Sequence, residues 1–365
     1  MFADLGNVIR QIEPLDEEWI RRAETRQASL TKPPGSLGRL EEVANRLVAI
    51  QGSLTPKVDR ARIVVFAADH GVTSEGVAPY PSAVTGQMVA NFLSGGAGVN
   101  ALARVAGAEV HVVDIGVASD LGHVAGVHQR RVASGTRNMA HEPAMTCEQA
   151  DAAIAVGLEM GRGAIAAGVD MIGLGEMGIG NSTAASAVTA ALTGLPVASV
   201  TGRGTGADDV MLAHKISVIE QALQRHRPDP ADAFDVLVKV GGFELAGLAG
   251  VVLAGAAGRK VVVTDGFIAT AAAALAVRLC PPAGEYLFAA HRSPEPGHTA
   301  LLTMIGQEPL LDLRMRLGEG TGAALAFVVI RAAVAAFTEM ATFASAGVSR
   351  RSDVPDAVVR SPGVS

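Results

Sequence analysis

The sequence predicts an α/β fold built on a parallel β-sheet, and three observations favour it. Five short apolar runs end in small or polar residues, as strands do where they open into loops: "ARIVVFAADHG", "AEVHVVDIGV", "VDMIGLGEMGIGN", "GRKVVVTDGF" and "EYLFAAHRS". Segments with helical periodicity separate these runs, which indicates parallel strands joined by crossover helices. Aromatic residues are scarce and glycines number 42, which indicates a core of small aliphatic side chains packed closely together.

Helices are also predicted outside the strand-containing region. Between residues 7 and 30, apolar side chains at helical spacing predict one or two helices that pack on another element. A further helix is predicted from Arg39 to Gln51, after a turn rich in proline and glycine. Residues 321–346 form one long helical pattern, and we expect the tail from 351 to 365 to be loosely ordered.

Composition and charge exclude several classes of protein. The net charge is −6 and the basic residues are scattered, which argues against a nucleic-acid partner. Cys147 and Cys280 are typical of unpaired thiols in a reducing compartment, and no Cys/His spacing suggests a metal site. The N-terminus does not resemble a signal peptide, and the longest apolar runs are shorter than the roughly 20 residues of a membrane span. We therefore expect a cytoplasmic protein without metal or membrane span.

The stretch "GLGEMGIGNSTAA" is the first candidate for ligand binding, because ligands of parallel sheets lie at the carboxyl ends of the strands. Gly178 and Gly180 allow close approach of the backbone, and Asn181 and Ser182 begin a helix. The N-terminus of that helix suits an anion such as phosphate, although an ordinary capped turn is the alternative. Glu176 would repel a phosphate, so it either faces ribose hydroxyls or a cationic ring, or is solvated.

Two other segments offer polar side chains after strands or in glycine-rich loops. In "TGRGTGADDVMLAHKISV", Gly204 lies in a bare loop, and Lys215 either reaches a phosphate as a point charge or is a solvated helix lysine. Asp265 ends another strand. Ser293 lies in "HRSPEPGH", but it lacks the G-x-S-x-G pattern of a nucleophilic serine.

Asp69 and His70 end the first predicted strand. Such a pair serves in acid/base catalysis, in metal binding or in structural hydrogen bonds. The absence of a second ligand pair nearby in the sequence favours the structural role.

Glu319 stands between Gly318 and Gly320 in "RLGEGTGAAL". The glycines leave the carboxylate without steric cover, and the apolar neighbours are expected to raise its pKa by desolvation. A carboxylate of that kind is a good general base. The alternative is a glutamate that caps the first turn of the helix over residues 321–346.

Together these stretches resemble the nicotinate-nucleotide:dimethylbenzimidazole phosphoribosyltransferase family. The matching segments run from Lys32 to about Leu325 and include "KPPGSLGRLE", "ADHGV", "GEMGIGNSTAA", "KVGGFELAGLAG", "DGF" and "MRLGEGTGAALA". The resemblance implies transfer of 5-phosphoribose from nicotinate mononucleotide to 5,6-dimethylbenzimidazole, giving α-ribazole 5'-phosphate and nicotinate. It also implies a doubly wound, Rossmann-like parallel α/β domain with a small helical domain, a homodimer and no cofactor.

The resemblance also assigns residues. Glu319 falls on the catalytic base of the family. The pocket for the acceptor base falls near "PYPSAVTGQM", where Tyr80 stands at a position that a serine can occupy in relatives and where either Gln87 or Met88 takes the place of a glutamine. An apolar slot of Tyr80, Met88 and Leu317 would suit a flat methylated ring. The substrate-binding residues expected are Glu176, Gly178, Gly180, Asn181, Ser182, Gly204, Lys215, Asp265, Ser293 and Gly318.

The expected division of the chain places residues 1–30 and 331–350 in the small helical domain and residues 31–330 in the phosphoribosyltransferase domain. The apolar stretch "AGLAGVVLAGAAG" is either part of a dimer interface or a buried core helix. Two other functions remain open. One is a nucleoside phosphorylase-like transferase that uses phosphate as acceptor, and the other is a nucleotide-binding regulatory module without catalytic activity.

Overall fold

The computed structural model describes residues 3–121 and 124–349. The chain forms two compact units, one of residues 3–15, 58–121 and 124–328, and the other of residues 16–57 and 329–349. This division differs from the expected one, because the first helix belongs to the unit with the sheet and residues 31–57 belong to the other unit. The tail over residues 351–365, expected to be loosely ordered, lies outside the described residues.

The larger unit contains a parallel sheet with the order β3-β2-β1-β4-β5-β6. Its strands are β1 (Ala61–Ala68), β2 (Ala108–Gly116), β3 (His128–Gln129), β4 (Met171–Met177), β5 (Val261–Thr264) and β6 (Leu287–Ala289). The five predicted strands and the doubly wound order are confirmed. The sequence pattern missed β3, because a strand of two residues carries no periodicity. The strand order reverses between β1 and β4, where ligands of such sheets bind.

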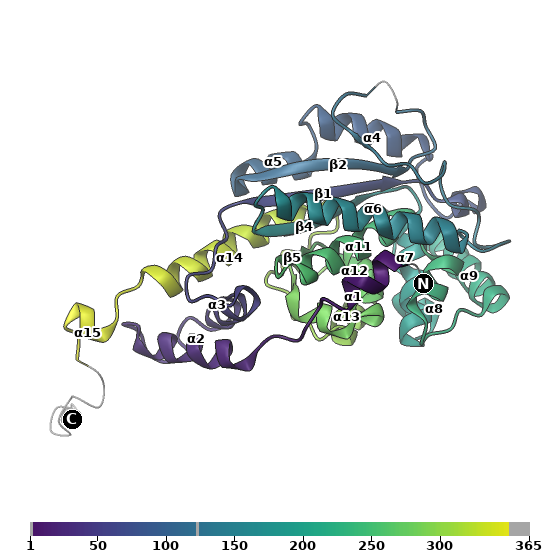
Figure 1. Ribbon diagram of the computed structural model, residues 1–365. Helices are drawn as coiled ribbons and strands as arrows, with labels where there is room; N and C mark the ends of the chain where they lie inside the picture. The colour runs from purple at the N-terminus through teal and green to yellow at the C-terminus, as the bar shows by residue number, and fades with distance from the viewer. Residues whose placement is uncertain (1–2, 122–123, 350–365) are drawn as a thin grey trace, which may run out of the picture. The chain divides into compact units, whose positions relative to one another are not determined.

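Figure 1 shows the helices of both units. They are α1 (Ala3–Ile9), α2 (Glu17–Ser29), α3 (Arg39–Gln51), η1 (Gly71–Glu75), α4 (Ala83–Leu93), α5 (Gly98–Ala106), α6 (Cys147–Ala166), α7 (Asn181–Thr193), α8 (Val197–Val200), α9 (Asp209–His226), α10 (Ala233–Val240), α11 (Phe243–Ala257), α12 (Phe267–Leu279), η2 (Pro281–Tyr286), α13 (Pro296–Met304), α14 (Thr321–Glu339) and α15 (Phe343–Ala346). The predicted helix from Arg39 to Gln51 is α3 and is confirmed.

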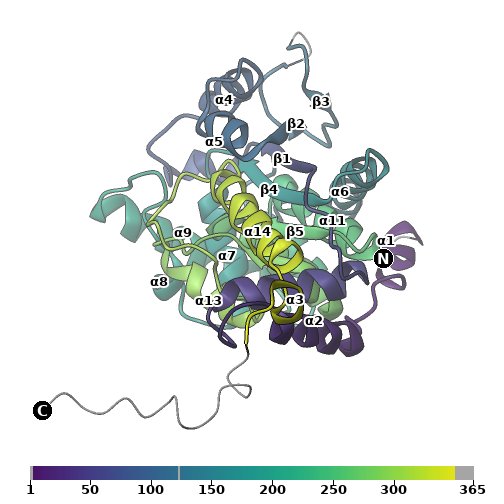
Figure 2. The same ribbon diagram turned by 90° about the vertical axis from the view of Figure 1, so that its left-hand side faces the viewer.

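Both faces of the sheet are covered by helices. Phe66 of β1 faces Gly247 of α11, whereas Ile63 of the same strand faces Gly320 at the start of α14. Successive side chains of a strand point to opposite faces of the sheet, and Ile63 and Phe66 are three positions apart. Helix α11 and the start of α14 therefore lie on opposite sides of the sheet. Figure 2 shows this arrangement, with α6 beside α11.

Helix α11 contains the apolar stretch for which a dimer interface was one interpretation. Its residues from Phe243 to Ala256 are all buried, so it is a core helix. Helix α6 lies against it so closely that a Cβ atom on Gly157 would stand 1.9 Å from the carbonyl oxygen of Gly247. Glycine at this crossing is therefore required for the two helices to pack.

The long helix predicted over residues 321–346 is interrupted. Helix α14 ends at Glu339, and Thr342 caps the short helix α15 by accepting a hydrogen bond from the N–H of Ser345 at 3.0 Å. The residues between them form main-chain contacts instead, since Thr31 N–H donates to the carbonyl of Ala341. Within the described residues, α14 alone is long and apolar enough to cross a membrane; core helices pass the same test, and more than half of its most apolar stretch is buried.

The smaller unit is built from α2, α3, the second half of α14 and α15. Arg26 of α2 donates hydrogen bonds of 2.9 Å to the carbonyls of Phe337 and Thr338, which lie at the end of α14. Arg22 lies over the ring of Trp19 at 4.0 Å from its centroid. Carbonyls at a helix C-terminus have no partner within the helix, so the guanidinium of Arg26 satisfies two of them.

Candidate active site

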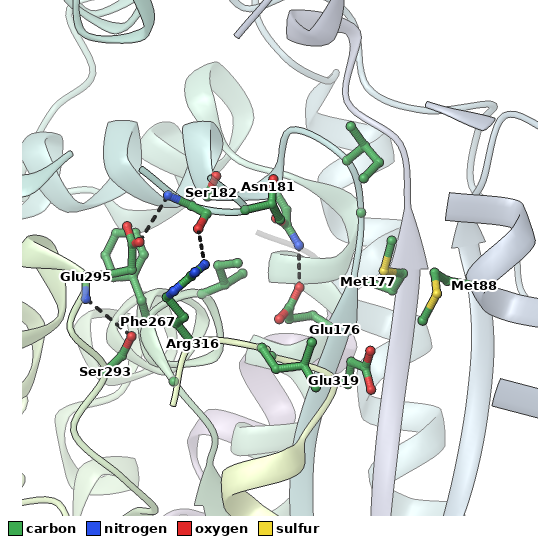
Figure 3. A pocket seen from close by; sticks show the side chains of 18 of the residues that line it. Met88, Glu176, Met177, Asn181, Ser182, Phe267, Ser293, Glu295, Arg316 and Glu319 are labelled. Atoms are coloured by element: carbon green, nitrogen blue, oxygen red, sulfur yellow. Dashed lines mark hydrogen bonds between the residues drawn. The ribbon is translucent and has the colours of Figure 1, made fainter. Parts of the chain in front are cut away.

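A cavity of about 380 Å³ opens at the carboxyl ends of β4, β5 and β6 in the larger unit, where the strand-end loops were expected to bind a ligand (Figure 3). Its lining residues are Tyr80, Val84, Met88, Glu176, Met177, Gly178, Ile179, Asn181, Ser182, Gly204, Thr205, Gly266, Phe267, Ile268, His291, Ser293, Glu295, Arg316, Leu317, Gly318 and Glu319. Most of the predicted site residues are therefore brought together in one cavity.

Glu319 adopts an unusual backbone conformation. Its φ angle is 65°, and the flanking Gly318 and Gly320 have φ angles of 83° and 90°. A non-glycine residue in the left-handed region costs about 1–3 kcal/mol and persists only where the surroundings hold it. The backbone of Glu319 packs against β4, since a Cβ atom on Gly175 would lie 2.6 Å from the Glu319 carbonyl oxygen.

The carboxylate of Glu319 is buried, with 5% of the residue exposed. Its Oε2 atom accepts a hydrogen bond from the N–H of Val99 at 3.1 Å, at the start of α5. Burial raises the pKa of Glu319, while hydrogen bonds from Val99 and Gly98 oppose the shift. The predicted alternative, that Glu319 caps its own helix, is wrong: the carboxylate lies at the N-terminus of α5 instead.

Glu176 lies beside Glu319 at the end of β4. Its Oε2 atom accepts a hydrogen bond from the side chain of Asn181, and the backbone N–H of Glu319 also bonds to its carboxyl group. Burial first, and then the charges of Asp265, Glu244 and Glu319, raise the pKa of Glu176 to about 8. Glu176 is therefore not solvated, and its surroundings favour the neutral form of its carboxyl group.

Gly318 is required by this arrangement. A Cβ atom there would lie 2.2 Å from the Oε1 atom of Glu176, and its φ angle is positive. Any side chain at this position would push Glu176 and the loop that carries Glu319 apart.

Cationic groups gather at the other end of the cavity. Lys215 is 2% exposed, and its Nζ atom donates a hydrogen bond of 2.9 Å to Ser182 Oγ, which lines the wall. Burial lowers the pKa of Lys215 to about 8, while the charge of Glu295 opposes the shift. Arg316 donates to the carbonyl of Gly204 at 3.1 Å (Figure 3). The charge of Glu295 acts on Lys215, but the hydrogen bond of Lys215 goes to a neutral hydroxyl group.

Apolar side chains line the cavity near Glu319. Figure 3 shows Met88 and Met177 on the same side as the Glu319 carboxylate. Tyr80 and Leu317 are 51% and 60% exposed. The expectation for Gln87 is wrong, because this residue is exposed and does not line the cavity. Consecutive helical residues point about 100° apart, so Met88 faces the cavity and Gln87 faces away.

Three other predicted substrate-binding residues lie behind the wall rather than in it. Gly180 faces His70 and Thr73, and Lys215 is not in the lining itself but bonds to Ser182 and lies close to Gly204, which both line the cavity. Asp265 bonds to backbone N–H groups of the loop that follows Glu319. Gly180 and Asp265 therefore contact other protein groups behind the lining residues, whereas the ammonium group of Lys215 lies next to two of the lining residues, Ser182 and Gly204.

Asp69 and His70 are buried and make structural hydrogen bonds. Asp69 accepts from the Thr85 hydroxyl at 2.7 Å and from the Ala118 N–H at 2.8 Å. His70 Nε2 lies 2.9 Å from Glu244 Oε1, and neither residue lines the cavity. The structural interpretation of this pair is confirmed. Within residues 3–121 and 124–349, no group of three or more His, Cys, Asp or Glu is arranged to hold a metal ion.

The sequence reasoning missed Arg316, Glu295 and Met177 as lining residues. Arg316 lies in the same glycine loop as Glu319, and a cation so close to a predicted substrate site was a signal that could have identified it. Met177 follows Glu176 directly at the end of β4. Glu295 accepts from the Gly204 N–H at 3.0 Å, a contact between distant segments that no local pattern reveals.

Comparison with known proteins identifies the family of this chain. A family model described as phosphoribosyltransferase matches residues 12–348, which defines the class of enzyme. The nicotinate-nucleotide–dimethylbenzimidazole phosphoribosyltransferase of Geobacter metallireducens is 56% identical, over 96% of this chain and 99% of that protein. Its namesake from Chloroflexus aurantiacus is 55% identical, over 94% and 98%. The crystal structure of CobT from Thermus thermophilus has a TM-score of 0.88 and 49% identity, over 91% of this chain and 99% of that one.

The chain therefore belongs to the nicotinate-nucleotide–dimethylbenzimidazole phosphoribosyltransferase family. The resemblance inferred from the separate motifs is confirmed across nearly the whole chain.

Proposed function

We propose that this protein transfers the 5-phosphoribosyl group of nicotinate mononucleotide to 5,6-dimethylbenzimidazole, with Glu319 as general base and with inversion at C1'. The observation that carries the proposal is the arrangement of one cavity, in which buried Glu319 lies among apolar side chains while Lys215 and Arg316 mark the opposite end. An acceptor base and a phosphate need these two different environments.

The phosphate of nicotinate mononucleotide would lie beside Ser182 and Gly204. A buried ammonium group is costly unless an anion compensates it, and Lys215 has only a neutral hydroxyl as hydrogen-bond partner. A phosphate at this place would supply the missing charge and would also be reached by Arg316. The start of α7 adds N–H groups and the positive end of the helix dipole.

The acceptor ring would lie between Met88 and Met177, with Tyr80 and Leu317 at the mouth. Thioether and aromatic side chains suit a flat methylated ring. As one ring nitrogen attacks C1', the other becomes acidic and loses its proton to Glu319. Since burial raises the pKa of Glu319, the carboxylate is a stronger base than one in water, a contribution typically of order 10²–10⁴ in rate.

The leaving group is a cationic pyridinium, so it departs as neutral-ring nicotinate without a general acid. Glu244, Asp265 and Glu319 lie near Glu176 and make this part of the cavity favourable for positive charge. We expect Glu176 to ionise when the cationic ring approaches, because an opposite charge favours the carboxylate. Attack from the face opposite the leaving group converts the β-nucleotide into an α-nucleotide.

The test is to incubate the protein with both substrates and identify the products by mass spectrometry and by comparison with α- and β-nucleotide standards. We expect nicotinate and α-ribazole 5'-phosphate in equal amounts, and no nicotinate release when dimethylbenzimidazole is omitted. Nicotinate release with inorganic phosphate as the acceptor would instead support a phosphorylase-like enzyme. Binding of nicotinate mononucleotide without any turnover would support a regulatory module.

A homodimeric state and a cytoplasmic location are part of the same proposal. The homodimer is supported by the resemblance of the sequence motifs to the family, and the cytoplasmic location by the composition of the chain and of its N-terminal segment. Analytical ultracentrifugation over a range of concentrations measures the mass in solution, and a mass of one chain throughout would contradict the dimer.

A further inference from the structure

The buried carboxylate of Asp265 has no contact with the cavity, although the sequence placed it among the substrate-binding residues. Both of its oxygens are used on the backbone that follows Glu319. Oδ2 accepts from the N–H of Gly320 at 2.9 Å, and Oδ1 accepts from the N–H of Gly322 at 2.6 Å. These are N–H groups at the start of α14, which have no partner within the helix.

Asp265 therefore caps α14 from another element, at the end of β5. The cap is closely fitted, because a Cβ atom on Gly322 would lie 2.6 Å from Asp265 Oδ1 and 2.1 Å from His291 Cδ2. His291 Nε2 lies 3.4 Å from Asp265 Oδ1. A side chain at position 322 would therefore collide with the Asp265 carboxylate and with the His291 ring, so glycine is required there.

We propose that Asp265 is a positioning residue, which holds Glu319 in its left-handed turn by fixing the backbone N–H groups of Gly320 and Gly322. The inference rests on the proposed function, since it concerns the proposed base of that reaction. A left-handed conformation of Glu319 is unfavourable on its own and needs an external constraint. Asp265 supplies this constraint directly after Glu319, and a displacement of about 1 Å at a reacting group can cost a hundredfold in rate.

The charge of Asp265 has a second consequence. It raises the pKa of Glu319, so its removal should lower that pKa. If ionised Glu319 is the base, activity rises as pH passes its pKa, and the acidic limb of the pH profile should then move to lower pH. A role limited to holding the backbone would leave this limb in place, so the two effects are separable by two variants.

Asp265→Asn removes the charge and retains at most one of the two hydrogen bonds, because the amide nitrogen is not an acceptor. Asp265→Glu keeps the charge but moves the oxygens by one methylene group. We expect both variants to lower kcat by about tenfold to a hundredfold, because a charge-assisted hydrogen bond to the backbone is lost and Glu319 is then less well positioned. The KM for nicotinate mononucleotide should stay within about threefold of wild type, because Asp265 does not contact the substrate in this proposal. The acidic limb should move to lower pH in Asp265→Asn only.

The decisive comparison uses Glu319→Gln as background. If Asp265 acts through Glu319, Asp265→Asn should cost no more than about twofold when added to Glu319→Gln. A further loss as large as in the wild-type background would overturn the proposal, and so would an unchanged kcat with a raised KM, which is the signature of substrate binding. Asp312→Asn, at an exposed carboxylate 3.9 Å from Arg292, is the control and should match wild type.

Hydrogen exchange separates this inference from the proposed function. In Asp265→Asn and Asp265→Glu, the amides of Gly320 and Gly322 should exchange faster than in wild type, while those of β4 should not change. This measurement needs no activity, so it tests the hold on the backbone even if the wild-type protein transfers no phosphoribose. Unchanged exchange at both glycines in either folded variant would overturn the proposal.

Discussion

Replacing Glu176 by glutamine should change how the stability of the protein depends on pH. Burial and the nearby charges of Asp265, Glu244 and Glu319 raise the pKa of Glu176 from 4.5 to about 8. In the unfolded chain the same carboxyl group loses its proton near pH 4.5. Folding therefore takes up a proton between these two pH values, and the stability that this provides is full below pH 4.5 and is lost as pH rises through 8.

The size of the effect follows from the shift. At about 1.4 kcal/mol for each pH unit, a shift of this size corresponds to about 5 kcal/mol of stability lost between the two pKa values. Glutamine has nearly the same shape and stays neutral at every pH. Glu176→Gln should therefore equal wild type in stability at pH 5 and exceed it by several degrees in unfolding temperature at pH 8.5.

The assay is thermal unfolding followed by circular dichroism in steps from pH 5 to pH 9, with Glu220→Gln, at an exposed site on α9, as the control. The difference between Glu176→Gln and wild type should widen up to about pH 8 and then stay constant, whereas the control should follow wild type throughout. A constant difference over the whole range would refute the reasoning, because it would mean that Glu176 ionises alike in the folded and unfolded chains.

Three further changes test the two ends of the cavity. Lys215→Met should raise the KM for nicotinate mononucleotide by about tenfold to a hundredfold in initial-rate assays, because a charge-assisted contact with phosphate is lost; an unchanged KM would place the phosphate elsewhere. Met88→Ala should raise the KM for dimethylbenzimidazole by about tenfold and leave that for nicotinate mononucleotide unchanged, whereas Gln87→Ala should have no effect on either. Gly318→Ala should lower both activity and unfolding temperature, since its Cβ would stand 2.2 Å from Glu176 Oε1 at a positive φ angle; wild-type behaviour would contradict the close contact.

Much of the fold could be predicted because its signals are local. Five short apolar runs of the sequence end in polar or small residues, and they coincide with β1, β2, β4, β5 and β6. The break between α14 and α15 could not be predicted, because the helical pattern continues through it. The break depends on the pairing of Thr31 with Ala341, which joins segments that lie far apart in the sequence.

The candidate site was predicted less completely, and the errors have a common cause. Residues such as Glu176 and Ser182 line the cavity as expected, since strand ends and helix starts are readable in sequence. Asp265 and Gly180 have the residue types of a binding site, but they contact other protein groups behind the lining residues. Whether a polar side chain faces a ligand or a backbone N–H group depends on tertiary packing, which local patterns do not contain.

The most direct test of the central claim compares Glu319→Gln with wild type in the transfer of phosphoribose from nicotinate mononucleotide to dimethylbenzimidazole. If Glu319 is the general base, kcat should fall at least about a hundredfold while the dissociation constant of nicotinate mononucleotide stays within a few fold of wild type. If both proteins turn over at the same rate, the carboxylate of Glu319 serves only as the partner of Val99 at the start of α5, and the proton leaves to water.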